Sequence, residues 1–518
     1  MTEHAAATSA VRVTRADEAS AADRAAIDAG TPSRALMQRA GAAAASEIVR
    51  RFGALLDRGV AVHAGPGNNG GDAYVVAAAL ARAGVRVGLT AWGPAEPKTD
   101  DARFERARAL AAGVGAPPTG AERVVVDGVL GVGASGAPHG WAAQAIRAIV
   151  QARTLGASVV ALDVPSGLDA TTGAMPGGVV RADCTLTFGS CKRGLLVARD
   201  CAGAIAVLDI GLDPSLMGDA PALVGRPAPR AFAASAHKGT RGKVVVYGGG
   251  AGMAGAALLA GRATLRTGAG LVKLVVDAAS VPVVQGALPS ALAAAWPDDD
   301  GALRRHVIDW ADAVLLGPGL GTGDDARARC ERTLQAWRGP VVVDADALNA
   351  FAGDLAALGA LLRGRPALVT PHPLELARLA GTPLDDLLSR RFDLPREIAA
   401  TLDATVLLKG TPTVVADARG VLVVPTGAPA LATGGSGDVL GGIASTLLAQ
   451  AAGERVASLA AEAAWVHDRA GAIAAERRGG ARGATLDEVV DALGDAWPRV
   501  AAPPAAYPVL AELPRVVG

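Results

Sequence analysis

Aromatic residues and lysine are scarce in this chain of 518 residues. Phe, Trp and Tyr together make up only 3% of it, which leaves few flat side chains on which the bases of single-stranded nucleic acid could stack. Acidic and basic side chains balance at 50 each, so no electrostatic attraction to nucleic acid or to an anionic membrane is expected. We therefore predict a protein that binds neither nucleic acid nor membrane.

Cysteine is also rare, with residues only at 184, 191, 201 and 330. No CxxC pair occurs, and the spacing suits no zinc site. Reduced, buried thiols are the expectation, and they are typical of a cytosolic protein. The N-terminal 20 residues contain no apolar core, so we expect no secretory signal and a cytoplasmic location. The apolar window 244–261 is interrupted by glycines, which favours a strand, a loop and a helix over a membrane span.

Short apolar runs alternate with Ala-, Leu- and Arg-rich helical stretches along the whole chain. That alternation is typical of α/β folds, and continuous apolar runs indicate parallel strands covered on both faces. The length favours two or three domains. In the N-terminal part we expect helices at 73–84 and 141–155 and these strands: 60–63, 85–90, 123–127, 158–163, 185–188 and 205–208.

A Pro-, Ala- and Arg-rich stretch at 219–229 interrupts this pattern. We interpret it as a linker, which gives domains at 1–222 and 228–518. A hairpin across 417–420 and long helices at 436–451 and 456–475 are expected in the second domain. Its predicted strands are 244–247, 271–276, 313–316, 341–344, 367–369, 405–408, 413–416 and 421–424.

Polar and glycine-rich segments follow three predicted strands of the first domain. The segment 65–72 reads GPGNNGGD, 127–136 reads DGVLGVGASG and 163–169 reads DVPSGLD. Ligands bind at the carboxyl ends of parallel strands, and free backbone N–H groups at a helix start favour anions. Carboxylates with neutral oxygens also suit a hard cation such as K⁺ or Mg²⁺. Each segment could instead be a turn or a helix cap.

These three segments resemble the NAD(P)H-hydrate epimerases, which interconvert the two C6 epimers of hydrated NADH and NADPH. The resemblance implies a Rossmann-like three-layer α/β domain and a K⁺ ion held by Asn69, Asp127 and Ser166. It implies Asp163 as the catalytic acid–base group, with Asp72 as the second choice. Ala73 and Val132 depart from the family pattern, and Val132 lacks a hydroxyl donor. The implied substrate contacts are Asn68, Asn69, Gly70, Gly71, Asp72, Gly131, Val132, Gly133, Ala134, Ser135, Gly136, Ala137 and Asp163.

The second domain carries the segment ATGGSGD at 432–438, directly before a long predicted helix. Glycines before a helix form an anion hole from backbone N–H groups. Asp438 could accept a proton from a substrate hydroxyl beside the phosphate, an arrangement that suits phosphoryl transfer. Three further strand ends, at 317–321, 344–349 and 370–375, and the segment KGTPT at 409–413 accompany it. A capped helix after a flexible turn is the alternative. Neither a Walker A sequence nor a GxSxG elbow occurs.

This half resembles the ribokinase-like superfamily and, more narrowly, the NAD(P)H-hydrate dehydratases. In this family the C6 hydroxyl is phosphorylated and phosphate is then eliminated. The resemblance implies a three-layer α/β domain, Mg²⁺, and ADP (or ATP) as co-substrate, with Asp438 as the catalytic base. Leu374 departs from the usual Gly. The implied substrate contacts are Ala256, Gly319, Gly321, His372 and Asp438, and the implied nucleotide contacts are Lys409, Gly410, Thr411, Pro412, Thr413 and Gly437.

Both resemblances together cover about residues 10 to 495 and imply a bifunctional repair enzyme that acts on hydrated NADH and NADPH. The family tends to form homo-oligomers, so a homo-oligomer is expected. One rival hypothesis is a small-molecule kinase with an accessory N-terminal domain, since the anion hole is common to both. A second is an N-terminal domain that only binds a protein or RNA. The choice between ADP and ATP, and between the two hydrates, stays open.

Overall fold

The computed structural model describes residues 8–425, 427–451, 453–503 and 506–516. The chain divides into two compact units, one formed by residues 9–223 with the C-terminal segment that contains the last strand, the other by residues 224–503. Each unit is an α/β structure built on a largely parallel sheet, so the predicted fold class is confirmed. No helix in these described ranges is both long and apolar enough to cross a membrane.

The first unit contains a sheet with the strand order β19-β8-β6-β5-β4-β2-β3. Neighbouring strands are parallel except β19, which pairs with β8 in the antiparallel sense. A short parallel pair, β1–β7, lies in the same unit. The strands are β1 (Thr8–Thr14), β2 (Val60–Ala64), β3 (Val87–Ala91), β4 (Val124–Gly128), β5 (Ser158–Leu162), β6 (Cys184–Phe188), β7 (Cys191–Lys192), β8 (Ala204–Leu208), β9 (Ala222–Val224) and β19 (Val509–Leu513).

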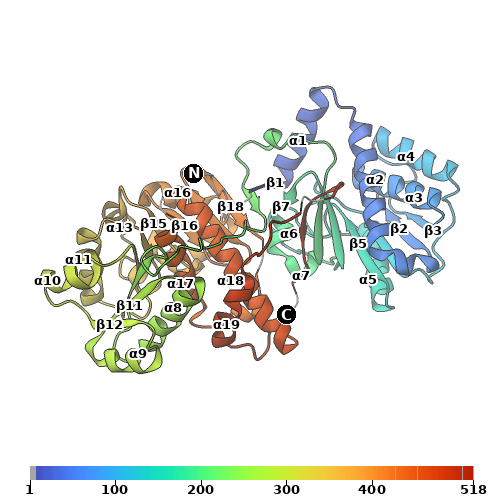
Figure 1. The fold of residues 1–518 in the computed structure, drawn as a ribbon. Helices are drawn as coiled ribbons and strands as arrows, with labels where there is room; N and C mark the ends of the chain where they lie inside the picture. Colours follow the sequence, from blue (N-terminus) through green and yellow to red (C-terminus); the bar gives the residue numbers. More distant parts are fainter. Residues whose placement is uncertain (1–7, 426, 452, 504–505, 517–518) are drawn as a thin grey trace. The chain divides into compact units, whose positions relative to one another are not determined.

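Helices cover both faces of this sheet (Figure 1). Side chains alternate between the faces along each strand. Val124 and Val126 therefore join one apolar cluster with α2 and α3, while Val125 joins a second cluster with α5. The helices are α1 (Ala16–Asp28), α2 (Ser33–Phe52), α3 (Asn68–Arg82), α4 (Asp100–Ala111), α5 (Gly140–Thr154), α6 (Arg193–Val197) and α7 (Arg199–Ala202), with 3₁₀ turns η1 (Gly53–Arg58) and η2 (Pro214–Met217).

The second unit has the strand order β12-β11-β10-β13-β14-β15-β16-β17-β18. Its strands are parallel as far as β16, and β17 and β18 then form the predicted antiparallel hairpin, with Asp417 opposite Gly420. The strands are β10 (Lys243–Tyr247), β11 (Leu271–Val276), β12 (Leu292–Ala295), β13 (Ala313–Leu316), β14 (Val341–Val343), β15 (Ala367–Val369), β16 (Thr405–Leu408), β17 (Thr413–Asp417) and β18 (Gly420–Val424).

Two long helices, α17 and α18, follow the hairpin where the sequence predicts them, and α17 packs against α8 and α18. Their small residues allow this close packing, since a Cβ added at Gly442 of α17 would lie 2.4 Å from a backbone oxygen of α8. The helices are α8 (Ala254–Thr267), α9 (Val281–Ala287), α10 (Asp300–Leu303), α11 (Asp324–Ala336), α12 (Asp346–Asn349), α13 (Leu355–Leu362), α14 (Pro373–Ala380), α15 (Leu384–Ser389), α16 (Leu394–Leu402), α17 (Ser436–Gln450), α18 (Val456–Arg478) and α19 (Leu486–Ala496), with turns η3 (Ala278–Ser280), η4 (Arg304–Ile308) and η5 (Pro429–Leu431).

Three local features differ from the sequence-based expectation. Helix α3 begins at Asn68 rather than Ala73, because the glycine- and asparagine-rich segment forms its first turn after the N-cap Gly67. Strand β9 lies inside the stretch interpreted as a linker. Strand β19 extends the sheet of the first unit, whereas the sequence-based boundary assigns the whole C-terminal end to the second domain. Apolar alternation over five residues is too short a pattern to reveal such an edge strand.

Candidate active sites

Asn69, Asp127 and Ser166 meet at the carboxyl end of the first unit's sheet. Asp127 is the last residue but one of β4. Its Oδ1 and Oδ2 accept hydrogen bonds from the Oγ and backbone N of Ser166 at 2.6 and 2.8 Å. The backbone of Leu130 joins the set, because its N–H donates to Ser166 Oγ and its oxygen accepts from Asn69 Nδ2, both at 2.9 Å. Burial raises the pKa of Asp127 to about 6. The structure thus brings the three predicted cation ligands together.

The side-chain carbonyl oxygen of Asn69 is buried and has no hydrogen-bond partner. A buried polar oxygen without a partner is unfavourable, so it marks a position where a ligand is needed. Amide, carboxylate and hydroxyl oxygens are the ligands that a hard cation prefers. The donor set therefore fits K⁺, which would be held by Asn69, Asp127 and Ser166.

Asp163 lies directly after β5 in a left-handed backbone conformation, with φ at 62°. Such a conformation is uncommon for a residue with a side chain and is often found at functional sites. Its Oδ1 accepts hydrogen bonds from the Nζ of Lys192 at 2.6 Å and from the hydroxyl of Thr187 at 3.1 Å. The Lys192 side chain is only 3% exposed, so a buried ion pair fixes the Asp163 carboxylate.

Lys192 is the functional candidate that sequence reasoning missed. Its Nζ also donates to the backbone oxygens of Phe188 and Ser190, at 2.8 and 3.3 Å, so its position is set by the turn after β6. The scarcity of lysine was the available signal, since only six lysines occur in the chain. No spacing rule connects Lys192 to Asp163, because 29 residues separate them.

Asp72 lies in the second turn of α3, not at its N-cap, which is Gly67. Burial, followed by the negative charges of Asp163 and Asp23, raises the pKa of Asp72 well above its ordinary value. Asp72 and Asp163 therefore have different surroundings: burial disfavours the ionised form of the first, and the second is paired with a cation. In the first turn of the same helix, Gly70 must remain a glycine, because a Cβ would lie 1.8 Å from the backbone oxygen of Gly65.

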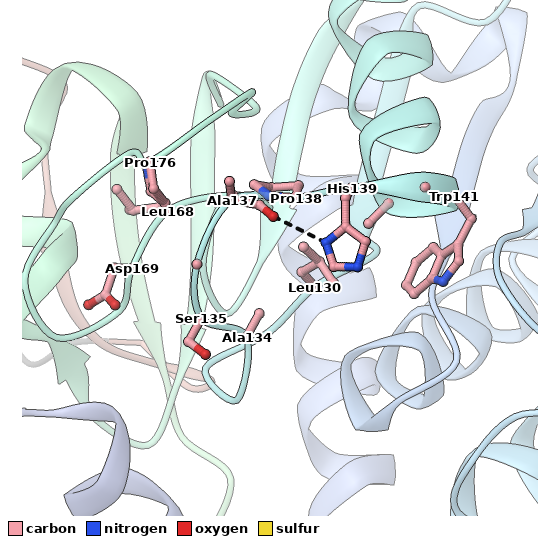
Figure 2. A pocket seen from close by; sticks show the side chains of 14 residues that line it. Leu130, Ala134, Ser135, Ala137, Pro138, His139, Trp141, Leu168, Asp169 and Pro176 are labelled. Atoms are coloured by element: carbon pink, nitrogen blue, oxygen red, sulfur yellow. Dashed lines mark hydrogen bonds between the residues drawn. The ribbon is translucent and has the colours of Figure 1, made fainter.

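The remaining predicted epimerase contacts, residues 131–137, form a largely exposed loop after β4. Its second half, Ala134 to Ala137, borders a cavity of about 270 Å³ that extends to the start of α5 (Figure 2). The exposed Asn68 begins α3, while Asn69, Gly70 and Gly71 are buried in its first turn. The structure therefore places the three predicted segments around one end of the sheet.

In the second unit, Lys409, Asp344 and Gly437 lie together at the start of α17. The Nζ of Lys409 lies 2.8 Å from Asp344 Oδ1 and 3.8 Å from Glu375 Oε2. A Cβ added at Gly437 would lie 3.0 Å from that Nζ and 3.5 Å from Asp344 Oδ2. The first backbone N–H groups of α17, after its left-handed N-cap Gly435, are without a side-chain cap. This arrangement can accept an anionic group next to a lysine.

Asp438 lies in the first turn of α17 and is partly exposed. Burial, followed by the negative charge of Asp344, raises the pKa of Asp438 to about 7, although Lys409 acts in the opposite direction. The carboxylates of Asp344 and Glu375 outweigh the effect of burial on Lys409, so the pKa of the lysine is raised and it stays charged. A carboxylate that titrates near neutral pH is suited to accept a proton.

Asp344 is almost fully buried, and its Oδ2 has no hydrogen-bond partner. Mg²⁺ keeps most of its water shell and binds proteins through one or two carboxylates together with phosphate oxygens. It therefore needs no larger cluster, and none of three or more His, Cys, Asp or Glu side chains occurs in the described part of the chain. The free Asp344 oxygen fits Mg²⁺, with Glu375 as the neighbouring carboxylate.

His372 is the N-cap of α14. Its Nδ1 accepts hydrogen bonds from the backbone N–H groups of Leu374 and Glu375, and Glu375 in turn accepts from the backbone N–H of His372 at 2.7 Å. This reciprocal capping fixes the imidazole. The side chain is nevertheless 47% exposed, so capping leaves part of the ring accessible to a ligand.

The other predicted dehydratase contacts lie in two places: Gly319 and Gly321 follow β13, close to the start of α8, and residues 410–413 follow β16. Gly319, with φ at 60°, approaches the start of α8, since a Cβ there would lie 3.1 Å from the Cβ of Ala256. Gly321 donates its N–H to Asp346 Oδ2 at 2.9 Å. The segment from Gly410 to Thr413 connects β16 to β17, and Thr413 donates its hydroxyl to the oxygen of Gly410. The structure brings Ala256 and Gly319 together.

A further buried contact supports α17 from α18. The Oγ of Ser436, the first residue of α17, lies 3.3 Å from the Nε2 of His467. Burial, followed by the charge of Lys409, lowers the pKa of His467 to about 3. The imidazole is therefore neutral at physiological pH. No sequence motif indicated this histidine.

Comparisons with known proteins agree with this division into two sites. Residues 33–194 match the family "YjeF-related protein N-terminus" and residues 244–493 match the family "NAD(P)H-hydrate dehydratase". The bifunctional NAD(P)H-hydrate repair enzyme of Salinibacter ruber is 37% identical, over 93% of this chain and 94% of the relative. The Escherichia coli enzyme of that name is 35% identical, over 74% and 75%. The structure of the ADP/ATP-dependent NAD(P)H-hydrate dehydratase from Bacillus subtilis, co-crystallised with ATP/Mg²⁺, is 29% identical and covers 52% of this chain and 93% of that one, with a TM-score of 0.45.

Proposed function

Since the chain belongs to the bifunctional NAD(P)H-hydrate repair enzymes, with an epimerase and a nucleotide-dependent dehydratase activity, we propose a role in each reaction for the residues described above. The first domain acts on the hydroxylated C6 carbon of the hydrated nicotinamide ring. The second removes water from that carbon and restores NADH or NADPH. The observation that carries the second assignment is the group of Lys409, Asp344 and Asp438 at the start of α17.

In the epimerase, Asp72, whose pKa is raised by burial, donates a proton to the C6 hydroxyl. The C–O bond then breaks, water leaves, and the lone pair of the ring nitrogen forms a C=N bond. Water returns to C6 from the opposite face, and Asp163 accepts the proton that this water loses. Proton exchange with solvent resets the two carboxyl groups. Lys192 supports these roles, because its contact at 2.6 Å holds the Asp163 carboxylate in place.

In the dehydratase, Asp438 accepts the proton of the C6 hydroxyl as the oxygen attacks the terminal phosphorus of ADP. AMP leaves, and phosphate is then eliminated with loss of a proton from the neighbouring carbon, which restores the ring double bond. Backbone N–H groups from Gly437 onward and Lys409 would bind the transferring phosphoryl group. Mg²⁺ bound at Asp344 would neutralise phosphate charge.

We further propose four properties that the sequence predicts. They are ADP as the preferred co-substrate, K⁺ at Asn69, Asp127 and Ser166, a homo-oligomer, and a cytoplasmic location. The four cysteines are all free and buried, which is in keeping with a reducing compartment.

One assay tests the dehydratase assignment against the rival small-molecule kinase. The full chain is incubated with a mixture of both NADHX epimers and either ADP or ATP, and absorbance is followed at the NADH wavelength. We expect recovery of absorbance with ADP at the higher rate. Absence of recovery with both nucleotides would contradict the assignment, and a higher rate with ATP would reverse only the nucleotide preference.

A second assay separates the epimerase from a domain that only binds. The chain is incubated with the pure R epimer and no nucleotide, and the two epimers are separated by chromatography. We expect the S epimer to form faster than without protein, and Asp163→Asn to abolish this acceleration. A wild-type rate equal to that without protein would identify the first domain as a binding module, and equal accelerated rates for the wild type and the variant would exclude Asp163 as the acid–base group.

A further inference from the structure

A cavity of about 270 Å³ lies beside residues 134–137. It is many times larger than the space that one ordered water needs. It extends from the glycine-rich loop to the first residues of α5 and to the loop after β5 (Figure 2). Its side chains include Ser135, His139, Trp141, Leu168, Asp169 and Pro176.

The cavity borders the epimerase site at Leu130 but is not lined by the groups that react there. Leu130, whose backbone binds Asn69 and Ser166, also lines the cavity. Asp163 and Lys192 do not line it. A hydrated dinucleotide has two nucleosides joined by a pyrophosphate. When its nicotinamide end lies at Asp163, its adenosine end lies away from the reacting groups, and the cavity that shares Leu130 with the Asn69 and Ser166 site is a neighbouring hollow that can receive it.

The walls of the cavity suit a flat aromatic ring. Trp141 is partly exposed. Its ring packs closely on Gly93, where an added Cβ would lie 3.3 Å from the Cε2 atom, and on the apolar cluster around Val125. His139, two residues before it, is exposed. Leu168 and Pro176 add apolar surface (Figure 2). Aromatic and apolar walls with few polar groups are typical of a pocket for a purine.

We propose that this cavity binds the adenosine end of NADHX and NADPHX, with the adenine ring stacked on Trp141. The proposal rests on the epimerase function given above and adds a recognition site outside the reacting groups. The hydrated nicotinamide ring is the poorer occupant, because saturation at C5 and C6 makes it non-planar and its hydroxyl needs the carboxyl groups of Asp72 and Asp163. Adenine is planar and stacks on indole without loss.

The test compares two substrates that differ only in the adenosine end. The R epimers of NADHX and of hydrated reduced nicotinamide mononucleotide are incubated with the full chain in the absence of ADP and ATP, and conversion to the S epimer is followed by chromatography. We expect Trp141→Ala to raise the KM for NADHX about tenfold with kcat unchanged. The KM for the mononucleotide, already higher than that for NADHX in the wild type, is expected to stay the same.

Two further variants control for folding. Trp141→Phe keeps a flat ring and is expected to restore most of the affinity for NADHX. Trp92→Ala removes another tryptophan of the same apolar cluster that does not line the cavity, and it is expected to affect both substrates alike. An equal rise in both KM values with Trp141→Ala, no rise in either, or a wild-type KM for the mononucleotide as low as that for NADHX would each overturn the adenosine site. If the wild type converts neither substrate, the epimerase assignment itself fails.

Discussion

Each domain holds a lysine–aspartate ion pair at its site, but the lysine contacts the proposed acid–base group itself only in the first domain. In the first domain Lys192 contacts Asp163 itself at 2.6 Å. In the second domain Lys409 contacts Asp344 at 2.8 Å, and the proposed base Asp438 is left without a direct cationic partner in the described contacts. Burial and Asp344 then raise the pKa of Asp438 to about 7.

This difference fits the different demands of the two reactions. Epimerisation needs one group that donates a proton and one that accepts a proton at the same carbon, and of Asp72 and Asp163 only Asp163 contacts a lysine directly in the described ion pairs. Phosphorylation needs a single base beside a cation that faces the nucleotide. A lysine paired with Asp344 supplies positive charge for phosphate without neutralising Asp438. The lysine therefore holds the acid–base group in the first site and faces the nucleotide in the second.

The largest expected effect comes from removing the proposed base of the second domain. Asp438→Asn cannot accept the hydroxyl proton, so we expect the dehydratase rate to fall about 10²- to 10⁴-fold, measured as NADH absorbance with the S epimer and ADP. Conversion of R to S without nucleotide should not change. Asp163→Asn is the matched control and should give the reverse pattern. Loss of both activities in either variant would contradict two independent sites.

A smaller effect is expected from breaking the pair in the first domain. Lys192→Met leaves Asp163 in a buried position without its cation, which misplaces the carboxylate and should lower kcat for epimerisation about 100-fold. The free energy of unfolding of this domain should fall by about 3 kcal/mol, measured by denaturant titration.

The exposed Lys98 provides the control for this experiment. Lys98→Met should leave kcat for epimerisation and the free energy of unfolding unchanged. Dehydration of the S epimer by Lys192→Met should also proceed at the wild-type rate, since the second domain is intact. Full epimerase activity in Lys192→Met would show that the ion pair has no role in the reaction.

Breaking the second pair should change a pH profile rather than abolish a reaction. For the wild type, kcat/KM of dehydration should rise with pH up to an inflection near 7 and then level off, because only the ionised Asp438 accepts a proton. Lys409 lowers that pKa, so in Lys409→Met the inflection should move about one pH unit upward, together with a higher KM for ADP. An inflection that stays in place would mean that Asp438 is not the titrating group.

The strand pattern and the glycine-rich segments could be read from the sequence because both depend on local order. Continuous apolar runs gave the parallel strands, and strand-end segments converge wherever parallel strands share an edge. This is why Asn69, Asp127 and Ser166 could be predicted as one group although 97 residues separate the first from the last. The function followed from family resemblance, since an anion hole alone also suits a kinase.

The contacts that the sequence did not reveal depend on side chains from distant segments. Lys192 reaches Asp163 only because the turn after β6 folds back onto the end of β5. For His372 the sequence predicts a ligand contact but not the local partner of the side chain. In the structure this residue caps α14, and its ring is partly accessible. Local spacing indicates where a polar residue lies but not which partner its side chain finds.

The smallest expected effect concerns His467, which contacts the first residue of α17 and so supports the anion hole. In His467→Asn the contact with Ser436 at 3.3 Å is lost. A hydrogen bond contributes about 1 kcal/mol net, and the loss of that free energy from ADP binding corresponds to a several-fold higher KM for ADP. The inflection near pH 7 should stay, because the imidazole is neutral there and is not the base. Movement of the inflection would instead make His467 part of the titrating group.

The stability of the second domain provides an independent readout for the same variant. The pKa of His467 is about 3 in the folded chain, below the unfolded value near 6.5, so protonation favours the unfolded state. The wild type should therefore lose part of its stability as the pH falls below about 6.5, and His467→Asn should lack that component of the loss. Equal pH dependence of unfolding in both proteins would show that the imidazole is accessible to protons in the folded state, and Ser436 would then lack a neutral partner at the start of α17.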